Sequence, residues 1–318
     1  MTDGGRDRNK GLRMRRVMSR SWPALMALGS GGLLAGCLPP MDLGGLVWLA
    51  PLPLLIALWA GGGERRRGWY GFRTAYLGGL TFWLLNLHWI SEVSTIGWIV
   101  VAMFLALYFG LWGGLAAGVG NPWRSQGEPG VGEGGALAAK VRERREESRR
   151  DSSWRESGRV IGHAALCAGW WCGLEWVRGW MLTGFGWNGL GVAFHNTPVL
   201  AQAADLVGVT GLAFLPLFVG GVMVQVGRGL HREVRRGRLR AHLEFGVAMT
   251  LMALCFLYGV WKLHGAGDDG EKIPVRVLMV QLNIPQDARE VLWTIDEVHG
   301  AYEEETRKAL AALEDGLE

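Results

Sequence analysis

The sequence contains seven apolar stretches that are long enough, or nearly long enough, to cross a lipid bilayer. They lie at residues 22–38, 43–60, 72–90, 96–120, 160–178, 206–227 and 245–261. A helix needs roughly 20 residues to cross the hydrocarbon core, and proline in the two short first stretches is tolerated where neighbouring helices compensate. The pattern predicts an all-α polytopic membrane bundle of about seven transmembrane helices over residues 22–262.

The basic residues alternate between successive connections. Lysine and arginine number seven before residue 22, three at residues 65–67, nine at 121–159 and six at 228–244. The connections at residues 39–42, 91–95 and 179–205 contain none. Because basic loops stay on the cytoplasmic side, the alternation predicts a cytoplasmic N-terminal tail over residues 1–21. It places the chain after Lys262 on the opposite side.

Composition agrees with membrane insertion and excludes an ordinary soluble domain. Hydrophobic residues make up 49% of the chain and charged residues only 19%, with 50 Gly and 17 Trp. Glycine and tryptophan enrichment suits membrane helices and their interfaces. The net charge of +4 comes from clusters between apolar stretches. Topology explains those clusters, so the bilayer is the predicted partner and nucleic acid is not.

The stretch GSGGLLAGCLPP has two interpretations. Leu34-Ala35-Gly36-Cys37 after an arginine-rich start is typical of a lipoprotein signal, in which Cys37 would be lipidated. Alternatively, Cys37 is a small apolar residue at the outer end of a first membrane helix. A second apolar stretch follows Pro40 at once, where a lipoprotein would continue into a polar body. The membrane helix is therefore favoured.

The cysteines indicate neither a metal centre nor a disulfide framework. All four lie in apolar stretches, and no pair has metal-ligand spacing with a nearby histidine: Cys37, Cys167, Cys172 and Cys255. Such cysteines are usually buried small side chains. We therefore predict no metal and no cofactor.

Two further segments differ in composition from the bundle. Residues 121–159 are rich in glycine and then in mixed charges, which indicates a solvated cytoplasmic helix or a disordered insertion, with a binding role as the less favoured alternative. KIPVRVLMVQLNIPQ, from Lys272, predicts a buried strand, and a capping box at Thr294 then begins a helix. One buried strand needs partner strands. We therefore expect residues 272–318 to be an incomplete β-α unit at the front of a longer protein.

Polar residues inside or beside the apolar stretches are the candidates for function, since such groups are costly in a membrane. They are Asn86, His88, Glu92, Glu175, Arg178, Asn188, His195 and Asp205. Glu175 and Arg178 are three residues apart, so they share a helix face and could pair. A structural pair is favoured over a catalytic one. His88 and Glu92 are expected at i,i+4 positions at the outer end of the third apolar helix, where they could make an interfacial hydrogen bond or contact lipid headgroups.

The outer connection GWMLTGFGWNGLGVAFHNTP is aromatic, rich in glycine and almost uncharged. This composition suits a re-entrant or interfacial segment, with Trp180, Phe185 and Trp187 at the level of the headgroups. Anchoring at the interface and a role in admitting lipid remain equally open.

Several stretches taken together resemble bacterial apolipoprotein N-acyltransferase, a membrane enzyme family with a nitrilase-like (CN hydrolase) domain. The matching stretches are LVWLAPLPLLIAL, GLTFWLLNLHWI, EWVRGWMLTGFGWNGLG, TPVLAQAADLVGVTGLAFL and VLMVQLNIPQD. They follow the family's order across residues 22–302. The resemblance implies an inner-membrane acyltransferase of lipoprotein biosynthesis, with the β-α unit beginning the nitrilase-like domain.

The resemblance also implies a mechanism. In this family a cysteine thiolate takes an acyl chain from a phospholipid donor, and the amine of a lipoprotein acceptor attacks the thioester. A glutamate acts as base and a lysine helps to stabilise the oxyanion. This triad lies downstream of the first strand and helix, which implies no catalytic residue in this chain and no activity of the chain alone. Trp293 would correspond to a functionally important tryptophan of the family.

The alternative is a protein without enzymatic activity. It could be a transporter-like bundle, or a degenerate relative that only binds lipids or lipoproteins. The stretches show no obvious internal repeat or charged midplane site, which disfavours a transporter.

Overall fold

The computed structural model describes residues 21–61, 66–123, 138–235, 242–265, 277–282, 284 and 293–315. Its described part is helical and contains no strand. A helix over residues 21–36 is followed by η1 (Gly44–Trp48), α2 (Leu52–Ala60), α3 (Arg67–Asn86), η3 (His88–Glu92) and α4 (Thr95–Gly118). Then come α5 (Ala138–Arg178), η4 (Met181–Thr183), η5 (Leu190–Phe194), α6 (Pro198–Ala201), α7 (Ala204–Leu212), α8 (Phe214–Arg235), α9 (Leu243–Gly265) and α10 (Ile295–Asp315).

Each of the seven apolar stretches contains helix, so their helical character is confirmed. Among the residues that the structure describes, length and composition mark only α4 and α9 as helices able to cross a membrane by themselves. Helices α7 and α8 pass the same test together, but a bend of 60° separates them. Gly208 lies within α7 with a φ of +71°, a left-handed conformation that glycine adopts readily. The described part therefore contains two, or at most three, candidate spans.

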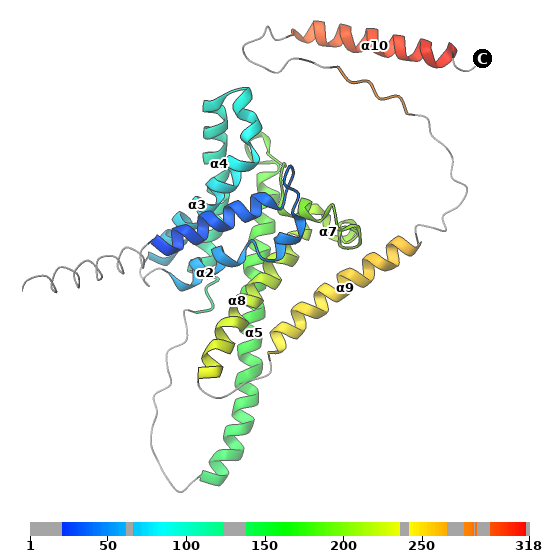
Figure 1. Ribbon diagram of the computed structural model, residues 1–318. Coiled ribbons are helices and arrows are strands. Elements are labelled where there is room, and N and C mark those ends of the chain that lie inside the picture. Colours follow the sequence, from blue (N-terminus) through cyan, green and yellow to red (C-terminus); the bar gives the residue numbers. More distant parts are fainter. Residues whose placement is uncertain are drawn as a thin grey trace, which may run out of the picture.

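Helices α3 and α4 form the closest helix pair of the bundle, seen in Figure 1 in light blue, cyan and blue-green. Small residues permit this approach, because a Cβ added at Gly71 would collide with the backbone carbonyl of Gly113. One added at Gly79 would lie 2.5 Å from the Phe109 side chain. Small residues at helix contacts are typical of membrane bundles, where close van der Waals packing favours association.

Helix α5 passes through the middle of the bundle and continues beyond it (Figure 1). It packs on α4 and α8, and the Trp112 indole N–H donates to the Cys167 carbonyl oxygen over 2.8 Å. Residues 138–159, expected to be either a solvated helix or a disordered insertion, are helical as the first part of α5. Residues 124–137 of that insertion lie outside the described residues.

The end of the chain differs from the expected strand and helix. Residues 277–282 and 284 form no strand, so the expected β-α unit is not shown, and the rest of residues 272–286 lie outside the described residues. Helix α10 is present with the expected capping box, because the Thr294 hydroxyl accepts from the Glu297 N–H. It lies apart from the bundle in Figure 1. Most of the expected basic tail, residues 1–20, is also outside the described part.

Candidate functional site at the outer loop

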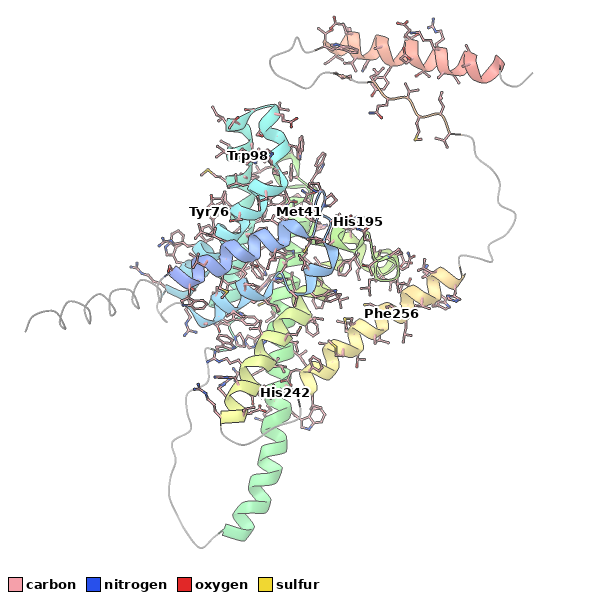
Figure 2. The ribbon with its side chains drawn as sticks, viewed as in Figure 1. Met41, Tyr76, Trp98, His195, His242 and Phe256 are labelled. Carbon is pink, nitrogen blue, oxygen red and sulfur yellow. The ribbon has the colours of Figure 1, made fainter. Side chains whose placement is uncertain are left out.

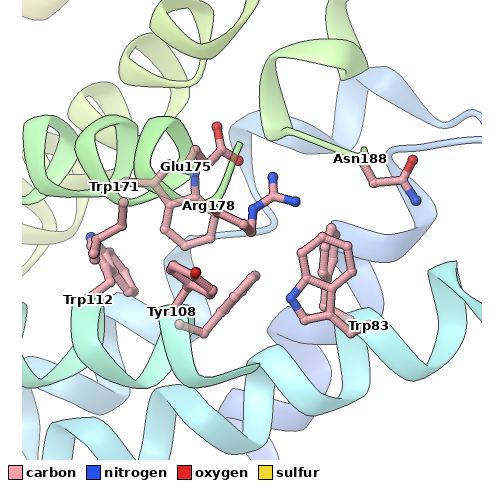
Figure 3. A pocket seen from close by; sticks show the side chains of 10 residues that line it. Trp83, Tyr108, Trp112, Trp171, Glu175, Arg178 and Asn188 are labelled. Carbon is pink, nitrogen blue, oxygen red and sulfur yellow. The ribbon is translucent and has the colours of Figure 1, made fainter. Parts of the chain in front are cut away.

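Arg178 anchors the loop that follows α5. Its side chain is 4% exposed, and one guanidinium nitrogen, Nη1, donates to the carbonyl oxygens of Phe185 (2.7 Å) and Trp187 (2.8 Å). The guanidinium carbon lies 4.8 Å from the centre of the Trp83 ring on α3. Figure 3 shows this side chain reaching from α5 toward Trp83. A single cation therefore ties the loop to two helices.

The loop needs unusual backbone conformations to reach Arg178. Leu182, Thr183 and Gly184 have positive φ values of 53°, 74° and 78°. A Cβ added at Gly184 would collide with the Gly179 carbonyl, so glycine is required there on two grounds. The turn reverses the chain just after α5 and presents its carbonyl oxygens to the guanidinium.

Glu175 binds a later part of the same loop. Its Oε1 accepts a hydrogen bond from the Leu190 backbone N–H over 2.9 Å, at the start of η5. Glu175 and Arg178 also attract each other through their charges. The predicted sharing of one helix face is therefore confirmed, but each side chain bonds to the loop, and no direct ion pair between them forms among the described contacts. The pair organises the loop.

An aromatic cluster lies beneath these two residues (Figure 3). Phe109 and Trp171 have ring centres 4.8 Å apart, and Trp112 and Trp171 are 5.1 Å apart, all in edge contacts. The cavity that remains has a volume of about 20 Å³. Glu175 Oε2 is buried, and the Trp171 side chain is its polar neighbour. This space suits one water molecule and is too small for an acyl chain.

A larger cleft opens on the other side of Glu175 and Arg178. Its volume is about 270 Å³, and α5, the outer loop and α7 line it. Trp176 and Trp180 at its border are 62% and 56% exposed, and their rings are 5.3 Å apart. Trp187, also exposed, stacks on Trp89 of η3 at 5.5 Å. The cleft and its border therefore combine apolar walls, two charged side chains and exposed indole rings.

Several other candidate residues are paired. Asn188 Nδ2 donates to Asn86 Oδ1 over 3.4 Å, which adds a second link between the loop and α3. His195 Nε2 lies 3.0 Å from Asp42 Oδ1 in the connection after the first helix. Asp205 Oδ2 lies 2.7 Å from Lys262 Nζ of α9.

The partners Asp42, Lys262 and Tyr258 were missed by sequence reasoning. Tyr258 OH donates to Asp205 Oδ1 over 2.7 Å. Asp42 is the only charged residue in the connection at residues 39–42, and this isolated charge is the one feature of the sequence that points to an ionic partner. His195 belongs to the outer connection, whereas His242 lies at the α8–α9 connection; both are labelled in Figure 2.

Three candidates are not brought into the loop's hydrogen-bond network. His88 and Glu92 lie in η3, a 3-10 helix, where both are exposed, and His88 packs on the Trp98 ring at 5.4 Å. Trp293 is 39% exposed and precedes α10, the helix that lies apart from the bundle in Figure 1. Helical i,i+4 geometry therefore does not apply to the His88 and Glu92 pair.

Fold and site together define a class: an α-helical protein with spans apolar enough for a membrane and a charged pair beneath an aromatic loop. Comparison with known proteins narrows this class. Residues 30–222 match the family model described as the apolipoprotein N-acyltransferase N-terminal domain. The chain belongs to the apolipoprotein N-acyltransferase family, which confirms the resemblance.

Curated relatives named apolipoprotein N-acyltransferase support this assignment. The chain is 30% identical to one from Geobacter metallireducens over 296 residues, which cover 91% of this chain and 48% of the relative. It is 27% identical to one from Allorhizobium ampelinum (84% and 44% covered) and 28% identical to one from Gloeobacter violaceus (86% and 44% covered). The chain thus spans about half the length of the curated relatives it matches.

Proposed function

We propose that this chain supplies the membrane part of an apolipoprotein N-acyltransferase. The complete enzyme would transfer an acyl chain from a phospholipid to the N-terminal diacylglyceryl-cysteine of a lipoprotein through a cysteine thioester. The single observation that carries the proposal for this chain is the outer loop held by Arg178 beside a cleft of about 270 Å³ with exposed indoles at its border. Both substrates are anchored in a membrane, so a catalyst needs such a surface at the headgroup level.

Each proposed site residue has a distinct part in this function. Trp180 and Trp187 contact the lipid interface with their exposed rings, and Phe185 packs on Trp83 at 5.8 Å to position them. Glu175 and Arg178 are positioning residues that hold the loop. Trp293 faces substrate from the extracytoplasmic segment. We expect the catalytic residues to be different from the proposed site residues just named.

We further propose the finer topology. All seven apolar stretches cross the bacterial inner membrane, with the N-terminus cytoplasmic and the chain after Lys262 extracytoplasmic. Residues 272–318 then begin the nitrilase-like domain, with the strand forming when the rest of its sheet is present. The strict alternation of basic connections supports this arrangement.

We also propose that these 318 residues do not transfer an acyl chain on their own. Two of the cysteines are packed as small core residues: Cys37 and Cys167 are at most 1% exposed, and their thiols donate to the Leu33 and Gly120 carbonyl oxygens. Such thiols cannot reach a lipid ester. The catalytic cysteine is expected in the nitrilase-like domain.

A chimera tests the proposal. The 318 residues are joined to the remaining part of the Geobacter metallireducens relative and expressed in bacteria depleted of their own transferase. Mass spectrometry of lipoprotein N-terminal peptides is expected to find the third acyl chain with the chimera and not with the 318 residues alone. A membrane-inserted chimera that never acylates would support a protein that only binds lipids or lipoproteins. Acylation by the 318 residues alone would contradict the proposal that they do not transfer an acyl chain on their own.

A further inference from the structure

A second groove lies at the beginning of α3, away from the outer loop. It has a volume of about 410 Å³ and lies between α3 and the start of the helix over residues 21–36. Arg66, which precedes α3, and Trp83, near the end of α3, are 17 positions apart, which corresponds to about 26 Å along the helix. Because Trp83 contacts Arg178, the groove is on the opposite side of the bundle from the outer loop.

The groove is positively charged. Arg66 and Arg73 both line it and both are exposed. Among the residues that the structure describes, no carboxylate forms an ion pair with either guanidinium. The N-cap Arg66 makes no side-chain hydrogen bond to the first turn of α3, so backbone N–H groups and the helix dipole add to the positive potential. An anionic group would be attracted to this end of the groove.

Apart from Thr74, the remaining side chains of the lining are apolar or aromatic. Trp69 and Tyr70 lie between the two arginines, and Leu77 continues the same helix face one turn further. Trp69 is 58% exposed and Leu77 is 38% exposed. Side chains of a helix tilt toward its N-terminus, so Arg73 is directed toward Arg66. Along the groove, the two aromatic side chains therefore lie between the two cationic ones, and an aliphatic side chain follows the second arginine.

We propose that this groove binds an anionic phospholipid from the leaflet on the side of the basic connections. The two guanidinium groups hold the phosphate, since arginine matches phosphate geometry with paired hydrogen bonds. The Trp69 ring lies at the interface, and an acyl chain follows α3 past Leu77. A free phosphate ion would use only the charged end. The proposal is independent of the transferase function.

Native mass spectrometry of the full chain in detergent tests this site. The protein is titrated with phosphatidylglycerol and, in parallel, with phosphatidylcholine. Phosphatidylglycerol is expected to bind more tightly. The double variant Arg66→Gln/Arg73→Gln is expected to lose about tenfold in phosphatidylglycerol affinity, as charge-assisted contacts are removed. The matched control Arg155→Gln/Arg235→Gln removes two exposed arginines elsewhere and is expected to change the affinity less than about twofold.

Four results would overturn the proposal: equal binding of the two lipids, an unchanged affinity of the groove variant, an equal loss in the control, or displacement of the lipid by millimolar inorganic phosphate. The last result would assign the groove to a free anion. Arg66→Lys/Arg73→Lys keeps both charges and is expected to bind more tightly than the glutamine variant. If the glutamine variant does not fold, the lysine variant is compared with the control, and a loss of affinity for phosphatidylglycerol is still expected because the paired hydrogen bonds are gone. No loss would again overturn the proposal.

Discussion

Replacing Arg178 by methionine is expected to release the outer loop. The change removes two hydrogen bonds from a charged donor, to Phe185 and Trp187, and the contact with the Trp83 ring. Hydrogen bonds in membrane proteins average only about 0.6 kcal/mol, whereas those to charged groups reach about 1.5–3 kcal/mol. With about 1 kcal/mol for each hydrogen bond and for the ring contact, we expect a loss of about 3 kcal/mol in the free energy of unfolding.

Arg228 is the matched control for this variant. Its guanidinium carbon lies 3.8 Å from the centre of the Trp123 ring, and within the described part of the chain no hydrogen bond joins it to a loop carbonyl. Arg228→Met is therefore expected to cost about 1 kcal/mol. Reversible unfolding in mixed micelles measures both variants, and limited proteolysis reports opening of residues 181–188. Equal costs, or a loop that stays protected in Arg178→Met, would refute the assignment of Arg178 as the anchor.

The remaining predictions concern packing, topology and capping. Gly71→Val is expected to lower the free energy of unfolding by about 2 kcal/mol or more, because its Cβ meets the backbone of α4, whereas Gly162→Val meets no atom within 4 Å and should cost under about 1 kcal/mol. Alkaline phosphatase fused at Lys272 should be active; an inactive but stable fusion would reverse the proposed topology. The Thr294 backbone N–H and hydroxyl lower the pKa of Glu297, so its support for α10 is present above the usual glutamate pKa and is lost as pH falls through the lowered value. Circular dichroism of a peptide with α10 should show this loss, and Glu297→Gln should reduce the pH dependence; identical titrations of the two peptides would argue against the cap.

Sequence periodicity predicted the helices well because apolar stretches and helix length are local properties. The shared face of Glu175 and Arg178 followed from their spacing alone. Their actual partners depend on the positive φ values of Leu182 and Thr183, which no residue preference signals. Long-range pairs such as His195 with Asp42 depend on how the bundle brings separate connections together. A strand at Lys272 would depend on pairing with other strands, and such long-range pairing is not encoded in the local pattern.

The length of α5 has a mechanical consequence. Its 41 residues correspond to about 60 Å, roughly twice the thickness of a bilayer's hydrocarbon core. Glu175 and Arg178, which bind the outer loop, lie at the C-terminal end of this helix, and its N-terminal end extends beyond the bundle. Because α5 is one continuous helix, a contact that tilts it at Ala138 would also tilt it at Glu175. The conformation of the outer loop is therefore coupled to contacts at the beginning of α5.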